Sequence, residues 1–307
     1  MRIIFLGTSD FALPALETLL GSEHTVICVV SRPPKPAGRG KKLRQPPVAE
    51  YSQKNLLELY QPEKLTEEFI NTLRSMEPEL IVSAAYGAWL PEKLLDASKL
   101  GVVNVHPSLL PRYRGAAPIT RAILDGMDET GVSFMITDSG WDTGPVIAVY
   151  HERILPSDTT GSLEERLSIK AADNIIEVIE GYSIGKLIPE EQPEDALYAD
   201  KIKTDETWLD WNMSARYLER KVRAFQPSPG ARTMHCGKLL KISSARLSDC
   251  NAGPGEIVLR EGLLHVGCGG EESLEILEIQ PASKSVMSAA EFLRGARMKT
   301  GDKLENH

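Results

Sequence analysis

The residues of this chain best suited to chemistry are Asn104 and His106, in a segment that reads Asn-Val-His-Pro-Ser-Leu-Leu-Pro. The short β-branched run 101–105 begins with glycine and is followed closely by proline, which predicts a buried strand. Side chains alternate faces along a strand, so the amide and the imidazole project to the same side where the strand ends. Ligands of open α/β sheets bind at that edge. An amide and an imidazole placed there are suited to stabilising a developing negative charge.

A carboxylate further along the chain is a candidate partner for these two residues. Asp142 lies in the turn-rich stretch Asp-Ser-Gly-Trp-Asp-Thr-Gly-Pro, residues 138–145, between two expected strands. Aspartate and glycine also supply the backbone geometry of ordinary turns, so a purely structural role is the alternative. If the turn brings Asp142 beside His106, the carboxylate would orient the imidazole and stabilise its positive charge.

The residues after His106 form a stiff apolar ridge. Residues 107–111 read Pro-Ser-Leu-Leu-Pro, and two prolines that enclose two leucines make a surface suited to a flat ligand. Ser108 is not a candidate nucleophile, because no base lies at an informative spacing from it. Residues 7–10, which read Gly-Thr-Ser-Asp, lack the second and third glycines of a dinucleotide-binding loop.

Residues 32–47 form a basic stretch within an otherwise acidic first half. They carry six Lys and Arg and no acid, and Gly38 and Gly40 leave the backbone around Arg39 free to bend. Most charge runs are only solvated loops, and that is one interpretation. The other is contact with phosphates, because a partner of opposite charge relieves the repulsion among the cations.

Strand and helix patterns alternate through the first half, which predicts crossover connections and a mainly parallel sheet covered on both faces. After Gly185 the chain turns to prolines and acids with few large apolar residues, as in a linker. A helix at 214–225 and several short strands follow, so we expect a small β domain, with an α+β tail as the alternative. Strands are expected at 3–6, 25–30, 80–84, 102–105, 132–137 and 146–150, and helices at 11–20, 65–76, 91–97, 117–124 and 162–179.

Bulk composition excludes several classes of protein. The 307 residues suffice for two domains, and no apolar run is long enough for a membrane span or a signal-peptide core, so we expect a cytoplasmic protein. The net charge of −8 argues against indiscriminate nucleic-acid binding but leaves room for a local basic patch. The cysteines and histidines lack metal-ligand spacing, so neither a disulfide framework nor a metal site is expected.

Taken together, these motifs resemble those of the formyltransferase family that uses 10-formyltetrahydrofolate. The Asn-x-His pair, Ser-Leu-Leu-Pro and the Asp-x-Gly-x-Asp-Thr-Gly loop at 138–144 form its signature. Three further segments are similar to the members that act on initiator tRNA. They are Pro-Ala-Gly-Arg-Gly-Lys-Lys at 36–42, Arg-Tyr-Arg-Gly-Ala-Ala-Pro-Ile at 112–119, and Leu-Glu-Arg with Arg-Ala-Phe between 218 and 225.

The resemblance implies an α/β fold: a doubly wound, mainly parallel sheet in a Rossmann-like formyltransferase domain, followed by a small OB-like β-barrel. It implies a catalytic domain at 1–187, a linker at 188–207 and a tRNA-binding domain at 208–307. The implied reaction moves a formyl group from the co-substrate 10-formyltetrahydrofolate to the free α-amine of methionine on initiator methionyl-tRNA, for translation initiation. A monomer that needs no metal and no membrane would carry it out.

Residue roles are implied by the same resemblance. Asn104 would donate a hydrogen bond to the oxygen that gains negative charge, charged His106 would assist it, and Asp142 would pair with His106 and help to move the proton. The expected folate contacts are Tyr86, Gly87, Ser108, Leu109, Leu110 and Pro111. The expected tRNA contacts are Arg39, Lys41, Lys42 and Arg44, with a contribution from Arg216, Arg220, Lys221 and Arg223 in the tail.

Three other functions stay open. A sibling enzyme that formylates an amino sugar on a nucleotide would share Asn104, His106 and Asp142, but it has no use for a basic segment that enters a groove. A folate hydrolase would need an arrangement that activates water and no tRNA-holding tail. An inactive RNA-binding module on this scaffold would not need the intact Asn-His-Asp set.

Overall fold

The computed structural model describes residues 1–37 and 42–306, which form two compact units. The division into a domain at 1–187, a linker and a domain at 208–307 stays a prediction. The N-terminal unit comprises Met1–Pro118, Glu129–Arg153 and Glu164–Ala199, and the C-terminal unit comprises Ile119–Asp128, Ile154–Leu163 and Asp200–His307.

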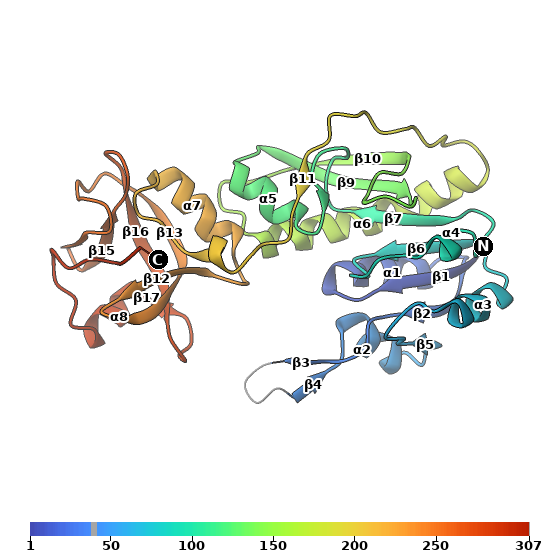
Figure 1. The fold of residues 1–307 in the computed structure, drawn as a ribbon, viewed down its shortest axis with the longest axis horizontal. Helices are drawn as coiled ribbons and strands as arrows, with labels where there is room; N and C mark the ends of the chain where they lie inside the picture. Colours follow the sequence, from blue (N-terminus) through green and yellow to red (C-terminus); the bar gives the residue numbers. More distant parts are fainter. Residues whose placement is uncertain (38–41, 307) are drawn as a thin grey trace. The chain divides into compact units, whose positions relative to one another are not determined.

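A seven-stranded sheet in the order β10-β9-β7-β6-β1-β2-β5 forms the centre of the N-terminal unit (Figure 1). The five strands from β7 to β5 are parallel, whereas β9 pairs antiparallel with β7, and β10 with β9. The expected mainly parallel α/β sheet is therefore confirmed. Its strands are β1 (Arg2–Gly7), β2 (Thr25–Val30), β5 (Leu59–Tyr60), β6 (Leu80–Ala84), β7 (Val102–His106), β9 (Glu129–Ile136) and β10 (Val146–Arg153).

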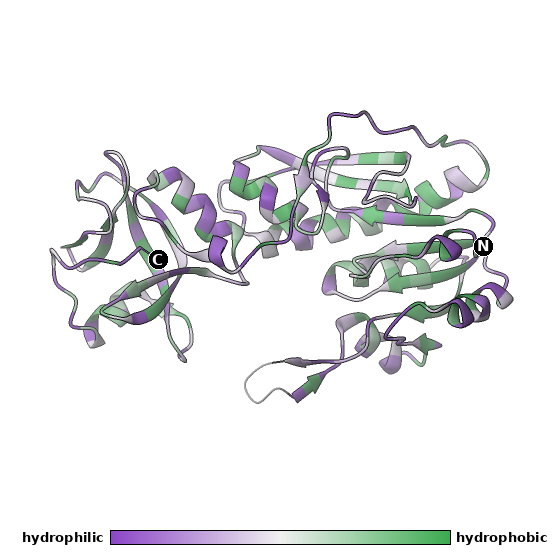
Figure 2. Cartoon of the chain, viewed as in Figure 1, coloured by the Kyte–Doolittle hydropathy of each residue, from purple (hydrophilic) through white to green (hydrophobic). Residues whose placement is uncertain are grey.

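Apolar side chains line both faces of this sheet, and the strands are the most hydrophobic segments of the unit in Figure 2. Residues 3–6 of β1 are fully buried, as in a central strand with helices on both sides. On one face, Ile4 and Leu6 pack with Leu73 of α3 and Leu94 of α4. The helices of this unit are α1 (Leu13–Leu20), which follows the 3₁₀ turn η1 (Asp10–Ala12), then α2 (Pro47–Lys54), α3 (Glu67–Ser75), α4 (Glu92–Leu95) and most of α6 (Thr160–Ser183).

The winding of the chain reverses at β1, because β2 pairs on one side of it and β6 on the other. The loops that follow β1 and β6 therefore diverge at the carboxyl edge of the sheet. Such a topological switch point is where doubly wound sheets form their ligand crevice. β7, next to β6, ends at the same edge with His106.

Two short strand pairs were not expected from the sequence. The basic stretch 32–47, expected as a loop, contains an antiparallel pair, β3 (Lys35–Ala37) with β4 (Lys42–Arg44). Within the expected linker, β11 (Tyr198–Ala199) pairs with β8 (Arg114–Gly115). Both pairs are too short for alternation of apolar residues to reveal them.

The C-terminal unit is an antiparallel β structure, which confirms the expected β domain. Its sheet has the order β12-β13-β16-β15-β14, with β17 beside β16. Trp211, Phe225 and Leu264 are fully or almost fully buried in its core. Its elements are most of α5 (Pro118–Asp125), η2 (Asp205–Thr207), α7 (Ala215–Ala224), β12 (Ala231–His235), β13 (Lys238–Ser248), β14 (Ile257–Arg260), β15 (Leu263–Gly267), β16 (Ser273–Pro281), β17 (Met287–Ser288) and α8 (Ala289–Gly295).

No helix in residues 1–37 and 42–306 is long and apolar enough to cross a membrane. Across the same residues, His, Cys, Asp and Glu side chains form no group of three that could hold a metal ion. Burial raises the pKa of the Cys28 and Cys268 thiols to about 12, so both behave as packing residues.

Candidate active site at the end of strand β7

Asn104 and His106 lie on β7 at the carboxyl edge of the sheet, as the sequence predicts. β7 sits between β6 and β9, so its last residues are held on both sides. His106 is only 4% exposed, whereas Asn104 is partly exposed. The strand thus presents an accessible amide beside a buried imidazole.

The structure brings Asp142 to His106. The Nδ1 atom of His106 lies 3.6 Å from the Oδ2 atom of Asp142. The Nε2 atom of the same ring lies 3.0 Å from the backbone carbonyl oxygen of Tyr113. Both ring nitrogens therefore face oxygens that only accept hydrogen bonds, an arrangement that suits an imidazolium carrying two N–H donors.

Backbone geometry sets the position of the Asp142 carboxylate. Its Oδ2 atom accepts a hydrogen bond of 2.9 Å from the backbone N–H of Gly115. Asp142 itself has φ of +52°, a left-handed conformation that costs a residue with a side chain free energy. Such strain tends to persist where the surrounding structure holds a functional group in place.

A glutamine from the expected linker fastens the Asp142 loop. The Nε2 group of Gln192 donates to the carbonyl oxygens of Asp142 and Gly144 at 2.9 and 2.7 Å. Its Oε1 atom accepts a 2.9 Å hydrogen bond from the Nε of Arg114, a residue only 7% exposed. Sequence reasoning missed Gln192, because neither its spacing nor its local pattern marks it.

Two glycines of the signature segments are required by close backbone approaches. A Cβ at Gly115, where φ is +117°, would lie 3.0 Å from the carbonyl oxygen of Ala199 in β11. A Cβ at Gly144 would lie 1.8 Å from the carbonyl oxygen of Ile136. Neither segment could adopt this backbone path with a side chain at Gly115 or Gly144. The two glycines therefore help to set the geometry around Asp142.

The expected folate-binding ridge divides into buried and accessible parts. Ser108 is fully buried, and its hydroxyl donates to the carbonyl oxygen of Arg112 at 2.6 Å. Leu110 is 8% exposed, and its N–H donates to the hydroxyl of Ser133. Leu109 and Pro111 are partly exposed. The buried pair fixes the loop, and the other pair is accessible to a ligand.

Two tryptophans lie on the loops that flank this region. Trp89 follows Tyr86 and Gly87 in the loop after β6, and Trp141 immediately precedes Asp142. Their rings pack with centroids 5.2 Å apart, although the residues are 48% and 62% exposed. Exposed paired aromatics are a common surface for binding flat ligands. No local pattern in the sequence marks these two tryptophans as a pair.

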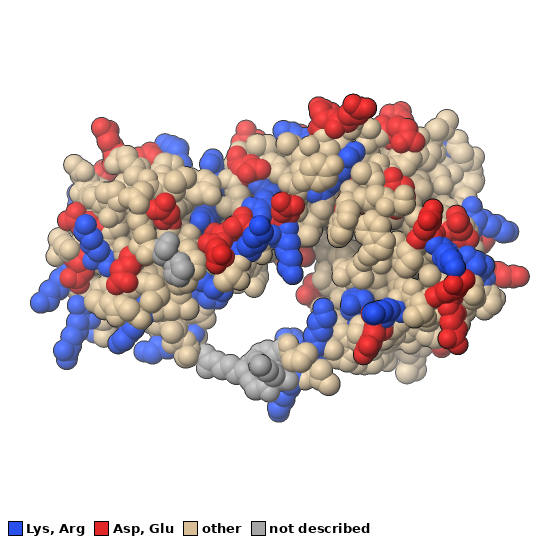
Figure 3. Space-filling model, viewed as in Figure 1, with Lys and Arg blue, Asp and Glu red and all other residues tan. Residues whose placement is uncertain are grey.

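The predicted tRNA-binding residues lie on and around the β3–β4 hairpin. Arg39 and Lys41 lie outside the described residues. Lys42 and Arg44 are exposed on β4. Figure 3 shows Lys and Arg side chains beside the described part of this hairpin. The two strands thus present cations to solvent.

The basic residues of α7 have partners within the C-terminal unit. Lys221 is largely buried and donates to the carbonyl oxygen of Trp208 at 2.6 Å, and burial lowers its pKa. Arg223 pairs with Glu219 and also donates to the carbonyl oxygen of Asp158. These cations are committed to holding the unit together, which leaves fewer for a partner than the sequence suggests.

Comparison with known proteins identifies the family. The formyl transferase model matches residues 1–179, and the formyl transferase C-terminal domain model matches residues 201–297. A methionyl-tRNA formyltransferase of Jannaschia sp. is 42% identical over 308 residues, which cover 99% of this chain and 100% of that protein. The chain belongs to the methionyl-tRNA formyltransferase family. Another relative with that name, from Halorhodospira halophila, is 40% identical over 312 residues and 99% of both chains.

Solved structures show the same fold at lower identity. The methionyl-tRNA formyltransferase from Clostridium thermocellum matches with a TM-score of 0.57 and 17% identity over 80% of this chain and 93% of that one. An N-formyltransferase from Helicobacter canadensis, solved with folinic acid and dTDP-3-aminofucose, matches with a TM-score of 0.69 and 18% identity over 92% and 99% of the two chains. Formyl transferases of this kind use a formyl folate as donor.

Proposed function

We propose that this chain transfers the formyl group of 10-formyltetrahydrofolate to the free α-amine of methionine on initiator methionyl-tRNA. The observation that carries the proposal is the convergence of Asn104, His106 and Asp142 at the ligand-binding edge of the sheet. Membership of the methionyl-tRNA formyltransferase family supports the choice of acceptor. In this reaction the folate supplies the formyl carbon, which the amine attacks.

Asn104 and His106 stabilise the negative charge that develops on the formyl oxygen. Asn104, partly exposed at the strand end, donates a hydrogen bond to that oxygen. One donor of this kind contributes about 3 kcal/mol in comparable sites. The imidazolium of His106 adds positive charge close to the formyl oxygen. The Asp142 carboxylate and the Tyr113 carbonyl oxygen hold its ring in position.

Asp142 has two tasks in the proposed mechanism. It keeps His106 charged and aimed, which the 3.6 Å approach of the two side chains permits. Its carboxylate is 21% exposed, so it also accepts a proton from the attacking amine, directly or through water, and passes it to the departing folate nitrogen. The Gly115 N–H and the Gln192 side chain hold the carboxylate in place during this exchange.

The donor binds between the loop after β6 and the Asp142 loop. Leu109 and Pro111 offer accessible apolar contacts, and Gly87, exposed with φ of +75°, offers its backbone. Tyr86 contributes its backbone too, while Ser108 and Leu110 act by fixing the ridge. The Trp89–Trp141 pair supplies an aromatic surface at the edge of this region.

The acceptor is held by the basic hairpin. Lys42 and Arg44, together with Arg39 and Lys41 outside the described residues, contact the phosphates and the major groove of the acceptor stem. An amino-sugar formyltransferase is the second candidate, because that function is consistent with the structural likeness to the Helicobacter canadensis enzyme. The basic hairpin favours the tRNA acceptor over a single sugar nucleotide.

One assay separates these candidates. The chain is given 10-formyltetrahydrofolate with either methionylated initiator tRNA or a dTDP-linked amino sugar, and products are identified by mass spectrometry. We expect N-formylmethionine on tRNA with the wild-type chain and a loss of most turnover with Asp142→Asn. Formylation of the sugar alone would replace the proposal with the second candidate. Formate release without transfer would indicate a folate hydrolase.

A further inference from the structure

Trp89 and Trp141 are large apolar side chains that the fold leaves exposed on two neighbouring loops. Trp89 lies in the loop between β6 and α4, and Trp141 lies in the loop between β9 and β10. Their ring centroids lie 5.2 Å apart and the ring planes are tilted by 52°, a favourable geometry for an aromatic pair. The residues remain 48% and 62% exposed, so part of each ring stays free. A contact between two indoles therefore joins the loops that flank the candidate active site.

The loop after β6 holds Trp89 in a fixed position. Ala88 and Leu90, on either side of Trp89, pack against the buried core on that face of the sheet. Earlier in the same loop, the carbonyl oxygen of Tyr86 accepts a hydrogen bond of 2.7 Å from the hydroxyl of Thr8. Because the residues around it are anchored, the Trp89 ring is a firm support for the side chain that packs on it.

Trp141 directly precedes Asp142 at the tip of the second loop. Asp138 closes this loop, because its Oδ1 atom accepts hydrogen bonds from the Gly140 N–H at 3.0 Å and from the Thr143 hydroxyl at 2.8 Å. Trp141 and Asp142 are the two residues between these anchored positions. The position of the Trp141 ring therefore affects the backbone of Asp142 directly.

Asp142 needs support on both sides because its backbone is strained. Its φ of +52° lies in the left-handed region, where a residue with a side chain stays only if its surroundings hold it. On the carboxyl side, Gln192 binds the carbonyl oxygen of Asp142. On the amino side, the Trp141 ring packs against Trp89. Loss of that contact would let the backbone at Asp142 relax and move its carboxylate relative to His106.

We propose that the Trp89–Trp141 contact positions Asp142, so that both tryptophans are positioning residues for formyl transfer. The inference deepens the proposed function and rests on it. Gly87, a proposed donor contact, lies two residues before Trp89, and Asp142 directly follows Trp141. The contact thus links the segment that binds the donor to the carboxylate that accepts the proton. The free parts of the rings still border the donor, a separate role with a separate kinetic signature.

Kinetics separate the positioning of Asp142 from contact with the donor. A ring that only contacts the donor contributes to binding, so its removal raises the donor KM and leaves kcat unchanged. A ring that positions Asp142 acts on the chemical step, so its removal lowers kcat, because a small misplacement of a catalytic group costs rate. An effect of the second kind also disappears when no carboxylate is left to position.

The variants are Trp89→Leu, Trp141→Leu and the two combined, each made with Asp142 and with Asp142→Asn. We expect either single change to lower kcat for formylation about tenfold, and the combined change by the same factor, because one shared contact is lost. The donor KM should rise less than about threefold. In the Asp142→Asn background the same changes should lower kcat less than about twofold further, since the group that they position is already missing.

Two further variants and a spectrum serve as controls. Trp89→Phe keeps an aromatic ring at the contact and should bring kcat to within about threefold of the wild type. Ile184→Ala removes an apolar side chain that is 76% exposed elsewhere in the N-terminal unit, and it should leave kcat unchanged. Circular dichroism reports the contact itself, because two adjacent indoles give an exciton couplet. Either leucine variant should lose this couplet while its thermal unfolding transition stays cooperative.

The possible outcomes separate the inference from the proposed function. A rise in donor KM with unchanged kcat would restrict the pair to the donor surface and overturn the inference. Equal losses of kcat with and without the Asp142 carboxylate would overturn it as well, because the rings would then act on another group. In both cases the wild-type chain still makes formylmethionine on tRNA, so the proposed function stands. Only the absence of that product from the wild-type reaction counts against the proposed function.

Discussion

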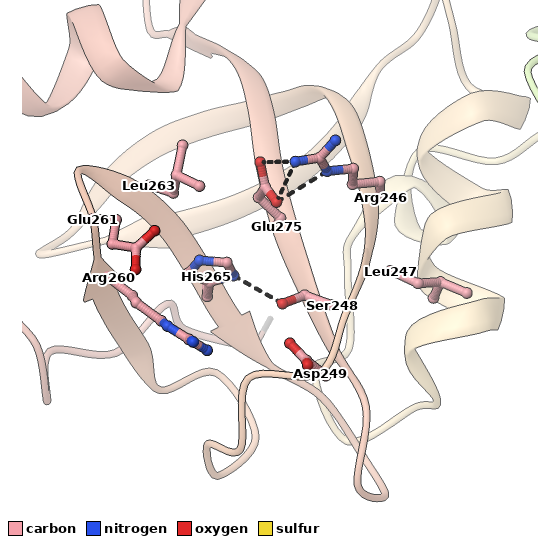
Figure 4. A pocket seen from close by; sticks show the side chains of 9 residues that line it. All are labelled: Arg246, Leu247, Ser248, Asp249, Arg260, Glu261, Leu263, His265 and Glu275. Carbon is pink, nitrogen blue, oxygen red and sulfur yellow. Dashed lines mark hydrogen bonds and ion pairs between the residues drawn. The ribbon is translucent and has the colours of Figure 1, made fainter.

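Each unit contains a polar site. In the C-terminal site the charged side chains pair mainly with one another, whereas in the N-terminal site backbone groups position the catalytic side chains. In the C-terminal unit, a pocket of about 420 Å³ is lined by Arg246, Ser248, His265 and Glu275, among others (Figure 4). Arg246 and Glu275 lie directly opposite each other on β13 and β16, and His265 lies opposite Glu275 on β15. Arg246, Glu275 and His265 thus form a polar row across this sheet.

The C-terminal pocket satisfies most of its polar groups internally. Glu275 accepts two hydrogen bonds of 2.9 Å from Arg246, and the hydroxyl of Ser248 pairs with Nδ1 of His265 at 2.9 Å. Among the described residues that line this pocket, Nε2 of His265 is the one side-chain nitrogen or oxygen buried without a partner. In the N-terminal unit, backbone groups hold Asp142 and His106. Side chains paired with each other stabilise a fold, whereas side chains positioned by backbone keep bonding capacity for a ligand.

The first prediction tests this difference between the two sites by replacing one carboxylate in each with an amide. Asp142→Asn should lower turnover by about three orders of magnitude, about 4 kcal/mol of transition-state stabilisation, because the pairing of His106 and the proton acceptor are both lost. Donor binding, measured by equilibrium titration, should stay nearly normal. Asp249→Asn in the C-terminal pocket is the control and should leave turnover within about twofold. Near-normal turnover of the Asp142 variant would remove it from the mechanism.

The second prediction concerns stability in the C-terminal unit. Arg246→Ala leaves the Glu275 carboxylate, which is 8% exposed, without its cation. We expect a loss of about 1–2 kcal/mol in the free energy of unfolding, less than for a fully buried pair because the Arg246 side chain is 64% exposed. Arg216→Ala breaks a pair exposed on both sides and should cost less than about 1 kcal/mol. Equal losses in denaturant titrations would show that burial of Glu275 contributes nothing.

The sequence predicts the parts of the site that lie within regular elements. Asn104 and His106 share a face because strand side chains alternate, and the strand itself follows from a short apolar run between glycine and proline. The formyltransferase signature adds Asp142, and the structure places it 3.6 Å from His106. These predictions depend on residues close together in the chain or on a motif long enough to be specific.

The sequence does not predict contacts between residues far apart in irregular segments. Gln192 lies 50 residues from Asp142, and its segment is brought to the site by the bridge between Val146 and Glu190 and by the pairing of β8 with β11. The internal bonds of helix α7 are a further example, because Lys221 and Arg223 donate to the carbonyl oxygens of Trp208 and Asp158. The expected contribution of this helix to tRNA binding stays a prediction.

The third prediction sharpens the role of backbone positioning. Gln192→Ala removes the donor that ties the carbonyl groups of Asp142 and Gly144 together. We expect kcat to fall about tenfold with little change in either KM, because small misplacement of a catalytic group costs rate more than binding. Gln280→Ala, which removes one side-chain bond to the Lys284 carbonyl in the C-terminal unit, is the matched control. A change in KM alone would assign Gln192 to substrate binding.

The smallest expected effect compares two carboxylates, one in each unit. Glu275 has Arg246 as its partner, whereas Glu164 on α6 is partly buried near Asp10. Burial, and to a smaller extent the Asp10 charge, raises the pKa of Glu164 above its ordinary value of 4.5. Between pH 4.5 and that raised pKa the folded state binds a proton that the unfolded state has lost, so stability falls as the pH rises through this interval.

Glu164→Gln keeps the shape of the protonated side chain and removes the charge. The variant should therefore be more stable than the wild type at pH 7, by less than about 1 kcal/mol, the usual limit for a change outside the core. The difference should shrink toward zero below pH 4.5, where the wild-type carboxyl is protonated in both states. Glu165→Gln removes the same charge from the exposed neighbouring position, and urea titrations at pH 7 and pH 4 compare the two. If both variants gain equally, general charge reduction explains the effect, and burial of Glu164 does not.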